Sequence, residues 1–311
     1  MGLCGLSLAW HRAVPLMGEA SEAVAQVLGV LATAVFVLLA AASLWRLRQH
    51  PQAWAEDRRH PVRHPFVAAI PASLLLLATV GTTQFGPGTA LRGLWMLGAA
   101  LQLSTTVWVL LRWWQARRNG GKHWMGVTPV VFIPIVGNVL APLAGFDLGL
   151  GGWATAQFAL GALMWPLVVV ATVQRVRSHG LWPERLRPSV FILIAPPALV
   201  GLGLLQLGAP NWVGWLMWTV ALGFAAWAAL QLPAISQQAL GLPHWALSFP
   251  LTAWAALSLR LGAPGSGPSL PAVALLATAS LVVGALVLGT VRGLRQGTLL
   301  VPEPVATLKV G

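Results

Sequence analysis

Long runs of apolar residues, separated by short polar or basic connections, make up most of this chain. Nine runs fall near residues 22–45, 66–84, 89–111, 128–146, 150–173, 189–207, 211–232, 243–260 and 271–291, and a shorter one, near 2–10, precedes them. Most reach the roughly 18 to 20 residues that an α-helix needs to cross a hydrocarbon layer about 30 Å thick, whereas barrel strands need only about 9 to 11. The pattern predicts one transmembrane domain over residues 1–311, of the all-α, polytopic class.

Proline divides these spans into two alternating sets. Counting the short stretch as the first, the third, fifth, seventh and ninth spans have interior prolines, namely Pro71, Pro134, Pro142, Pro196, Pro197 and Pro250. The second, fourth, eighth and tenth have none, and Pro166 in the sixth is the exception. A proline within a membrane helix frees a carbonyl and kinks the helix, and protein or a water-filled cavity must satisfy that defect. We therefore predict that the odd spans lie inside and the even spans face lipid.

The spacing of the spans indicates repeated units. The even spans begin near residues 22, 89, 150, 211 and 271, a step of about 60 residues that predicts five helical hairpins. We expect ten transmembrane helices in a pseudo-fivefold ring around a central pore. The inner helices are predicted near 2–10, 66–84, 128–146, 189–207 and 243–260, and the outer ones near 22–45, 89–111, 150–173, 211–232 and 271–291. Residues 2–10 make about half a crossing, so the first helix is expected to be truncated, with the native chain starting upstream of Met1.

The charge is sparse and unevenly placed. Hydrophobic residues are 57% of the chain and charged residues 8%, with a net charge of +12. Sixteen of the 19 Lys and Arg residues follow the second, fourth, sixth and tenth spans, which leaves Arg12, Arg92 and Arg260 on the other side. This is the positive-inside pattern, and it predicts a cell (inner) membrane protein with both termini in the cytoplasm. We interpret the basic charge as orientation in the lipid bilayer, not as nucleic-acid binding.

The predicted lumen has no ionisable residue at depth. Arg92 and Asp147 lie at span ends, and the polar residues within the spans are the neutral Gln102, Asn138, Gln157 and Gln206. Pumps coupled to protons or sodium usually hold Asp, Glu, His or Arg within the membrane. Freed backbone dipoles and hydroxyl groups can replace part of an anion's hydration without trapping it; the candidate hydroxyls are Ser73, Thr79, Thr128 and Ser248. The sequence thus favours a passive route for small anions.

Four segments resemble one known family. They read HPVR at 60–63, FIPIVGN at 132–138 leading to Ala141-Pro142, FILIAPP at 191–197 and WALSFPL at 245–251. Together they are similar to the tellurite-resistance/dicarboxylate transporter family, which includes bacterial TehA proteins, fungal malate permeases and sulfite exporters, and the slow anion channels of plant guard cells. The resemblance implies a ten-helix protomer with a central pore, homotrimeric in the bacterial members, that a phenylalanine of the ninth helix occludes.

Matched onto this chain, that phenylalanine is Phe249, between Ser248 and Pro250. A ring at a bent helix can block a narrow passage, and hydrophobic constrictions can gate by dewetting. The alternative is an ordinary packed aromatic. Some bacterial relatives have glycine where this chain has Pro250, so the local backbone need not match theirs. The predicted pore lining comprises Ser248 and Asn138 with Pro71, Pro134, Pro142, Pro196, Pro197 and Pro250.

Other chemistry has weaker signals. His60 and His64 could form a metal pair, but neighbouring prolines favour an extended segment and a third ligand is missing. Asn138 could instead make an interhelical hydrogen bond. No phosphate loop, metalloprotease motif or nucleophile elbow is present, so we expect no cofactor, no metal and no catalysis. Three hypotheses remain: a channel-like anion permease, which we favour; a proton-coupled C4-dicarboxylate or tellurite carrier or exporter; and a membrane enzyme or sensor that uses His50, His60 and His64.

Overall fold

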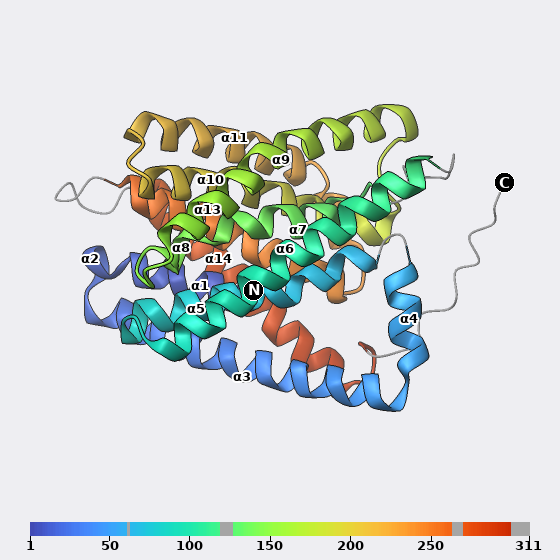
Figure 1. Cartoon of the computed structure of the whole chain (residues 1–311), viewed down its shortest axis with the longest axis horizontal. Helices are drawn as coiled ribbons and strands as arrows, with labels where there is room; N and C mark the ends of the chain where they lie inside the picture. The colour runs from blue at the N-terminus through green and yellow to red at the C-terminus, as the bar shows by residue number, and fades with distance from the viewer. Residues whose placement is uncertain (61–62, 119–126, 263–269, 300–311) are drawn as a thin grey trace.

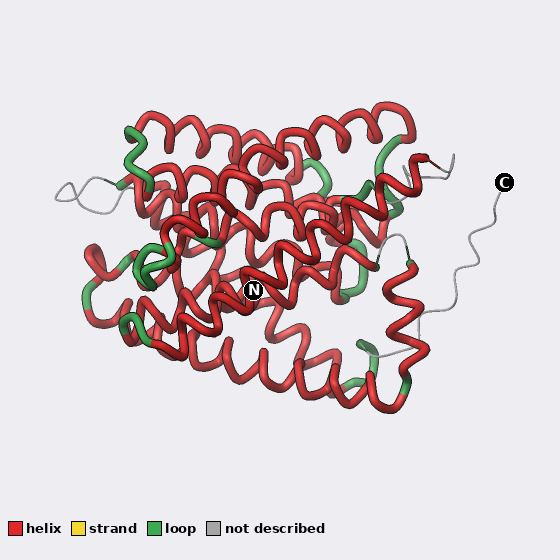
Figure 2. Tube along the Cα trace, viewed as in Figure 1, coloured by secondary structure: helices red, strands yellow, loops and turns green. Residues whose placement is uncertain are grey.

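The computed structural model describes all residues except 61–62, 119–126, 263–269 and 300–311. Long helices run side by side along one direction (Figure 1), and no strand occurs among the described residues (Figure 2). Seven described helices are long and apolar enough to cross a membrane. The predicted all-helical, polytopic membrane fold is confirmed. The count of long helices is lower than ten because the predicted spans near 2–10, 128–146 and 243–260 form shorter or interrupted helices.

One set of helices is long, continuous and mostly exposed. It comprises α3 (Glu19–Gln49), α6 (Thr89–Arg118), α9 (Gly151–His179), α11 (Asn211–Ala229) and α14 (Leu270–Arg295). Between 11% and 33% of their most apolar windows is buried, and exposed side chains such as Leu38 and Leu163 cover their surface. An apolar surface needs no protein cover where lipid tails are the solvent. Pro166 lies inside α9 without ending it.

The segments that carry the other prolines are interrupted and buried. They are η1 (His64–Ala68) with α5 (Ala69–Phe85); η3 (Pro129–Val131), α7 (Phe132–Val136), η4 (Gly137–Leu140) and α8 (Pro142–Gly145); η5 (Glu184–Ile194) with α10 (Ala195–Gln206); and η6 (Leu242–Leu247) with α13 (Ser248–Leu261). The windows of His64–Phe85 and Glu184–Gln206 are 67% and 94% buried. The short α1 (Gly2–Arg12) is also mostly buried. Burial therefore separates the two sets of spans as proline does, except that α1 is buried without a proline and α9 is exposed with Pro166.

The prolines mark a change of helix type, which differs from the predicted kinks. Pro71 and Pro250 are the third residues of α5 and α13, Pro142 is the first of α8, and Pro196 is the second of α10. The N–H groups of a first helical turn have no helical partner, so proline fits there without loss of a hydrogen bond. Its ring disfavours an α-helical residue just before it. Most of these segments therefore consist of a 3₁₀ stretch followed by a fresh α-helix.

The buried segments contact one another in a closed order. α1 packs on α5, α5 on η4 and α8, these on α10, α10 on α13, and α13 back on α1. Each buried segment also contacts the long helix that follows it in the chain: α1 with α3, α5 with α6, η4 with α9, α10 with α11, and α13 with α14. These contacts are those of hairpins arranged around an axis, with the interrupted member of each hairpin toward the axis.

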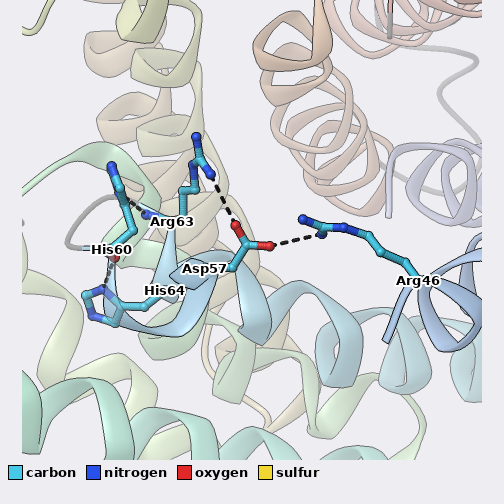
Figure 3. Close-up of polar contacts among 5 residues, drawn as sticks. All are labelled: Arg46, Asp57, His60, Arg63 and His64. Atoms are coloured by element: carbon cyan, nitrogen blue, oxygen red, sulfur yellow. Dashed lines mark hydrogen bonds and ion pairs between the residues drawn. The ribbon is translucent and has the colours of Figure 1, made fainter. Parts of the chain in front are cut away.

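Short helices lie in the connections: α2 (Val14–Met17) joins α1 to α3 within the first hairpin, whereas α4 (Pro51–Arg59) and α12 (Leu232–Ser236) lie between hairpins. α4 lies across one end of the bundle (Figure 1). There Asp57 forms ion pairs with Arg46 at 3.0 Å and with Arg63 at 3.2 Å (Figure 3). His60 Nδ1 accepts the backbone N–H of Arg63 at 3.3 Å, and His64 Nδ1 lies 3.1 Å from the His60 carbonyl oxygen. These histidines take part in the local turn. The described part of the chain holds no group of three or more metal-ligating side chains.

Candidate functional site

A cavity of about 430 Å³ lies among the buried segments. Residues of α1, α5, α10 and α13 line it, together with Leu143 of α8 and Asp147 just after that helix. Its wall thus takes residues from each helix of the closed ring of contacts except η4, which lies just before α8 in the chain. A cavity bordered by all of these segments is placed to form part of a route along their common axis.

Phe249 borders one end of this cavity. It lies in the first turn of α13, half-buried, and the other lining residues of that helix follow on the same face: Thr252, Ala253, Ala256 and Arg260. With a rise of 1.5 Å per residue, Phe249 and Arg260 are separated by about 16 Å along the helix. The cavity therefore has an aromatic end and a charged end. The lining residues of α1 run the same way, from Gly5 to Arg12.

A close approach of α1 to α13 holds the aromatic end together. A Cβ atom at Gly5 would lie 3.0 Å from Cδ2 of Phe249 and closer still to Oγ1 of Thr252. A Cβ atom at Gly2 would likewise collide with the side chain of Ser248. Only glycine lets the two backbones come this near without displacing those side chains. The ring of Phe249 is therefore positioned by α1 as well as by its own helix.

The middle of the cavity wall is neutral. Its hydroxyl groups belong to Thr79 and Thr83 of α5 and to Thr252 of α13. Each donates a hydrogen bond within its own helix: Thr79 to the Leu75 carbonyl at 2.8 Å, Thr83 to the Val80 carbonyl at 3.0 Å, and Thr252 to the Phe249 carbonyl at 2.8 Å. Their protons are engaged, so in this arrangement they turn lone pairs, not donors, toward an anion. Among the predicted hydroxyls, Thr79 is a lining residue of this cavity, whereas Ser73, Thr128 and Ser248 are not.

Ionisable side chains gather at the other end, which we call the mouth. His11 and Arg12 come from α1, Arg260 from α13, and Asp147 from the turn after α8. The sequence places these residues at span ends, and it gives no sign that they meet. The fold brings them together because α1 and α13 run in parallel and end at the same level, next to the turn that carries Asp147.

Asn138 lies in a buried polar network away from the cavity. Its Nδ2 donates to Thr106 Oγ1 at 2.9 Å and to the Pro134 carbonyl at 3.1 Å, and its Oδ1 accepts Gln157 Nε2 at 3.0 Å. Gln102 Nε2 donates to the same Pro134 carbonyl at 2.8 Å. Side chains of α6 thus satisfy a carbonyl of the interrupted segment, and Gln157 of α9 satisfies the amide oxygen of Asn138, as burial in an apolar environment requires. The interhelical role that the sequence left open for Asn138 is the one observed.

The other predicted pore residues also lie outside the lining of this cavity. Ser248 is buried and donates to the Trp245 carbonyl at 2.6 Å. The prolines are buried in the contacts between segments: Pro71, Pro134, Pro142, Pro196, Pro197 and Pro250. The prolines determine the shape of the segments, and other residues of those segments line the cavity. The sequence reasoning missed Gly5, Thr252 and the mouth; a signal was present in Arg12 and Arg260, which belong to the small basic minority opposite the cytoplasmic loops.

Comparisons with known proteins agree with this architecture. The family model SLAC1, described as "Voltage-dependent anion channel", matches residues 1–291. The "Tellurite resistance protein TehA homolog" of Haemophilus influenzae is 26% identical over 307 residues, covering 96% of this chain and 89% of that protein. The "S-type anion channel SLAH2" and "S-type anion channel SLAH3" of Arabidopsis thaliana are 25% and 23% identical over 84% and 86% of this chain.

This chain spans about half the length of those plant relatives, 50% of the first and 42% of the second. The family model, by contrast, covers nearly all of the present chain, from α1 to the last turns of α14. The similarity therefore includes every helix that borders the cavity. This multi-pass membrane protein belongs to the SLAC1 family of anion channels and transporters.

Proposed function

We propose that this protein lets small anions pass the membrane passively, along the axis of the buried segments, past a gate formed by Phe249. The substrates are halides, nitrate, oxyanions of the sulfite or tellurite type and small carboxylates. The observation that supports this most directly is the position of Phe249 at the inner end of a cavity bordered by all the buried segments. Its half-buried ring faces open space on the cavity side and α1 at Gly5.

The neutral stretch beyond the mouth favours passive movement. Apart from Phe249 and the charged mouth, the lining consists of apolar side chains, glycine, threonine hydroxyls and the neutral amide of Gln206. A coupled carrier needs a group at depth that binds a proton or a cation. An anion crossing a neutral stretch meets no deep well, so it can both enter and leave quickly. Conduction is then limited by the constriction at Phe249, which an anion passes when the ring changes rotamer or position.

The experiment is anion flux in liposomes of defined anionic and zwitterionic lipid. The parent protein and Phe249→Ala are reconstituted, and nitrate and chloride efflux are measured with no energy source. Truncating the ring should raise the leak at least about tenfold, because it removes the hydrophobic constriction. Phe224→Ala is the matched control: it makes the same change in the outer helix α11 at a half-buried position that does not line the cavity. Equal leak from Phe249→Ala and the parent, with both folded, overturns the gate.

A second function remains in competition: a proton-coupled carrier or exporter of C4-dicarboxylate or tellurite. The name of the Haemophilus influenzae relative refers to tellurite resistance, and an imidazole, His11, and a carboxylate, Asp147, line the mouth. This function requires accumulation of substrate against its gradient when a pH gradient is imposed. Passive passage predicts equilibration only. Measuring malate and tellurite uptake in the same liposomes, with and without a pH gradient, separates the two.

We further propose a homotrimer in the inner membrane with both termini in the cytoplasm. The trimer is implied by resemblance to the bacterial members of the family. The orientation is supported by the basic loops and by Asp57, Arg46 and Arg63 at the end of the bundle opposite the mouth. Native mass spectrometry in mild detergent tests the trimer. Labelling of a single cysteine introduced at Asp57, in a Cys4→Ala background in intact cells, tests the orientation.

A further inference from the structure

The mouth of the cavity carries an excess of positive charge. Arg12 is the last residue of α1, Arg260 is the next to last of α13, and both line the cavity with Asp147. Among the described residues, neither guanidinium forms an ion pair, and Asp147 forms none either. Two positive groups against one negative group leave a net charge of +1 before His11 is counted. Such a cluster repels itself unless a negatively charged ligand joins it.

The mouth also offers hydrogen-bond donors that nothing in the described structure uses. His11 is half-buried, and its Nδ1 is buried without a hydrogen-bond partner among the described residues. Buried polar atoms normally have a partner. Each guanidinium adds planar N–H donors whose spacing matches the oxygens of a carboxylate, nitrate or sulfur oxyanion. The threonine hydroxyls deeper in the cavity differ, because their protons are already donated within α5 and α13.

We propose that His11, Arg12 and Arg260 form an anion-capture site at the mouth, which loads the passage before Phe249. This inference rests on the proposed function, since the captured ion is the one that then moves to the gate. The ligands are small anions, with planar and tetrahedral oxyanions favoured by the arginine forks. Asp147 weakens the site, which keeps a bound anion able to leave, as conduction requires.

The charge of the ion provides a quantitative signature. A positive potential at the mouth raises the local concentration of a singly charged anion by some factor. It raises the local concentration of a doubly charged anion by the square of that factor. A charged cleft raises the local concentration of its counter-ion by about 10-fold to 1000-fold. If neutralising both arginines weakens nitrate binding about tenfold, it should weaken sulfate binding about a hundredfold. In a site that recognises shape alone, the affinities for nitrate and sulfate would fall by similar factors.

The first test is made in the Phe249→Ala background, where the gate does not limit flux. The half-saturating nitrate concentration and the sulfate concentration that halves nitrate flux are measured at constant ionic strength. The double variant Arg12→Gln with Arg260→Gln should raise the nitrate concentration about tenfold and the sulfate concentration about a hundredfold. Asp147→Asn should lower both concentrations. Arg92→Gln is the matched control: it removes the same charge from an exposed residue of α6 that does not line the cavity. Unchanged values in the double variant, or an equal change in Arg92→Gln, overturn the capture site while leaving the gate standing.

The second test does not need flux. Detergent-solubilised parent protein and Arg12→Gln with Arg260→Gln are heated in increasing nitrate or sulfate, with gluconate to hold ionic strength. A ligand that binds only the folded state raises Tm as its concentration exceeds Kd. We expect the parent to be stabilised, more by sulfate than by nitrate, and the double variant to lose both shifts. Should Phe249→Ala prove no leakier than the parent, this binding result alone supports or overturns the capture site.

Discussion

Replacing Gly5 by alanine tests the closeness of α1 and α13 at the gate. The added Cβ would lie 3.0 Å from Cδ2 of Phe249 and 3.2 Å from Cβ of Thr252, with Thr252 Oγ1 closer still. Ordinary van der Waals contacts begin at 3.4 Å, so both side chains, or the helices that carry them, must move by several tenths of an ångström. Overpacking of this kind costs about 1 to 3 kcal/mol. For a chain of 311 residues, one kcal/mol corresponds to about 1.5 °C in Tm.

The assay is thermal unfolding in detergent, followed by tryptophan fluorescence, for a double-mutant cycle. Gly5→Ala should lower Tm by about 2 to 5 °C. In the Thr252→Ala background the nearest atom is gone, so the same substitution should cost at most half as much, with a coupling energy of about 1 kcal/mol. Gly93→Ala in α6 is the control, because no atom lies within 4 Å of its added Cβ. Alanine is the better helix former, so that variant should be unchanged or more stable.

Two results would refute this reasoning. A Gly5→Ala protein as stable as the parent would mean that α1 and α13 are further apart than 3.0 Å implies. An equal cost of Gly5→Ala with and without the Thr252 side chain would mean that the contact partner lies elsewhere. In the first case the ring of Phe249 would not be positioned by α1; in the second, Thr252 would not be the residue that α1 contacts.

Three further substitutions have definite expected outcomes. Asn138→Ala removes hydrogen bonds to Thr106 and Gln157 at a fully buried site, so Tm should fall by several degrees, equivalent to about 1 to 3 kcal/mol, while the nitrate-to-chloride flux ratio of Phe249→Ala stays the same. Asp57→Asn breaks two exposed ion pairs and should change stability by less than about 1 kcal/mol; a larger loss on thermal unfolding would contradict this. Thr79→Val removes a hydroxyl whose proton is donated to the Leu75 carbonyl, so nitrate flux should change less than about twofold, whereas a large loss would show that the hydroxyl turns to serve the anion.

Much of the fold could be predicted from the sequence, because lipid imposes simple rules. Spans follow from apolar length, and the buried set follows from proline, since a broken backbone cannot face lipid. What proline does locally could not be predicted. Whether a given proline bends one helix or begins a second depends on the packing around it; Pro166 stays within a continuous α9, whereas Pro250 follows a 3₁₀ stretch.

The candidate site was less predictable than the fold. Phe249 was found by resemblance, and it does border the cavity. The mouth was not found, because Arg12, Asp147 and Arg260 are far apart in sequence and each looks like an ordinary span end. For Asn138 the sequence left two roles open, pore lining and an interhelical hydrogen bond, and the structure shows hydrogen bonds to Thr106 of α6 and Gln157 of α9. Contacts of this kind depend on the rotation of each helix, which composition does not fix.

The 3₁₀ stretch η6 ties the direction of Phe249 to how tightly the preceding chain is wound. A 3₁₀-helix turns about 120° and rises about 2.0 Å per residue, against about 100° and 1.5 Å for an α-helix. Over the six residues of η6, rewinding to α would swing the benzyl group about 120° around the axis of α13 and shorten the segment by about 3 Å. If the chain at Leu242 moved about 3 Å toward α13, η6 could rewind and the ring of Phe249 would turn with it, without any hinge in α13 itself.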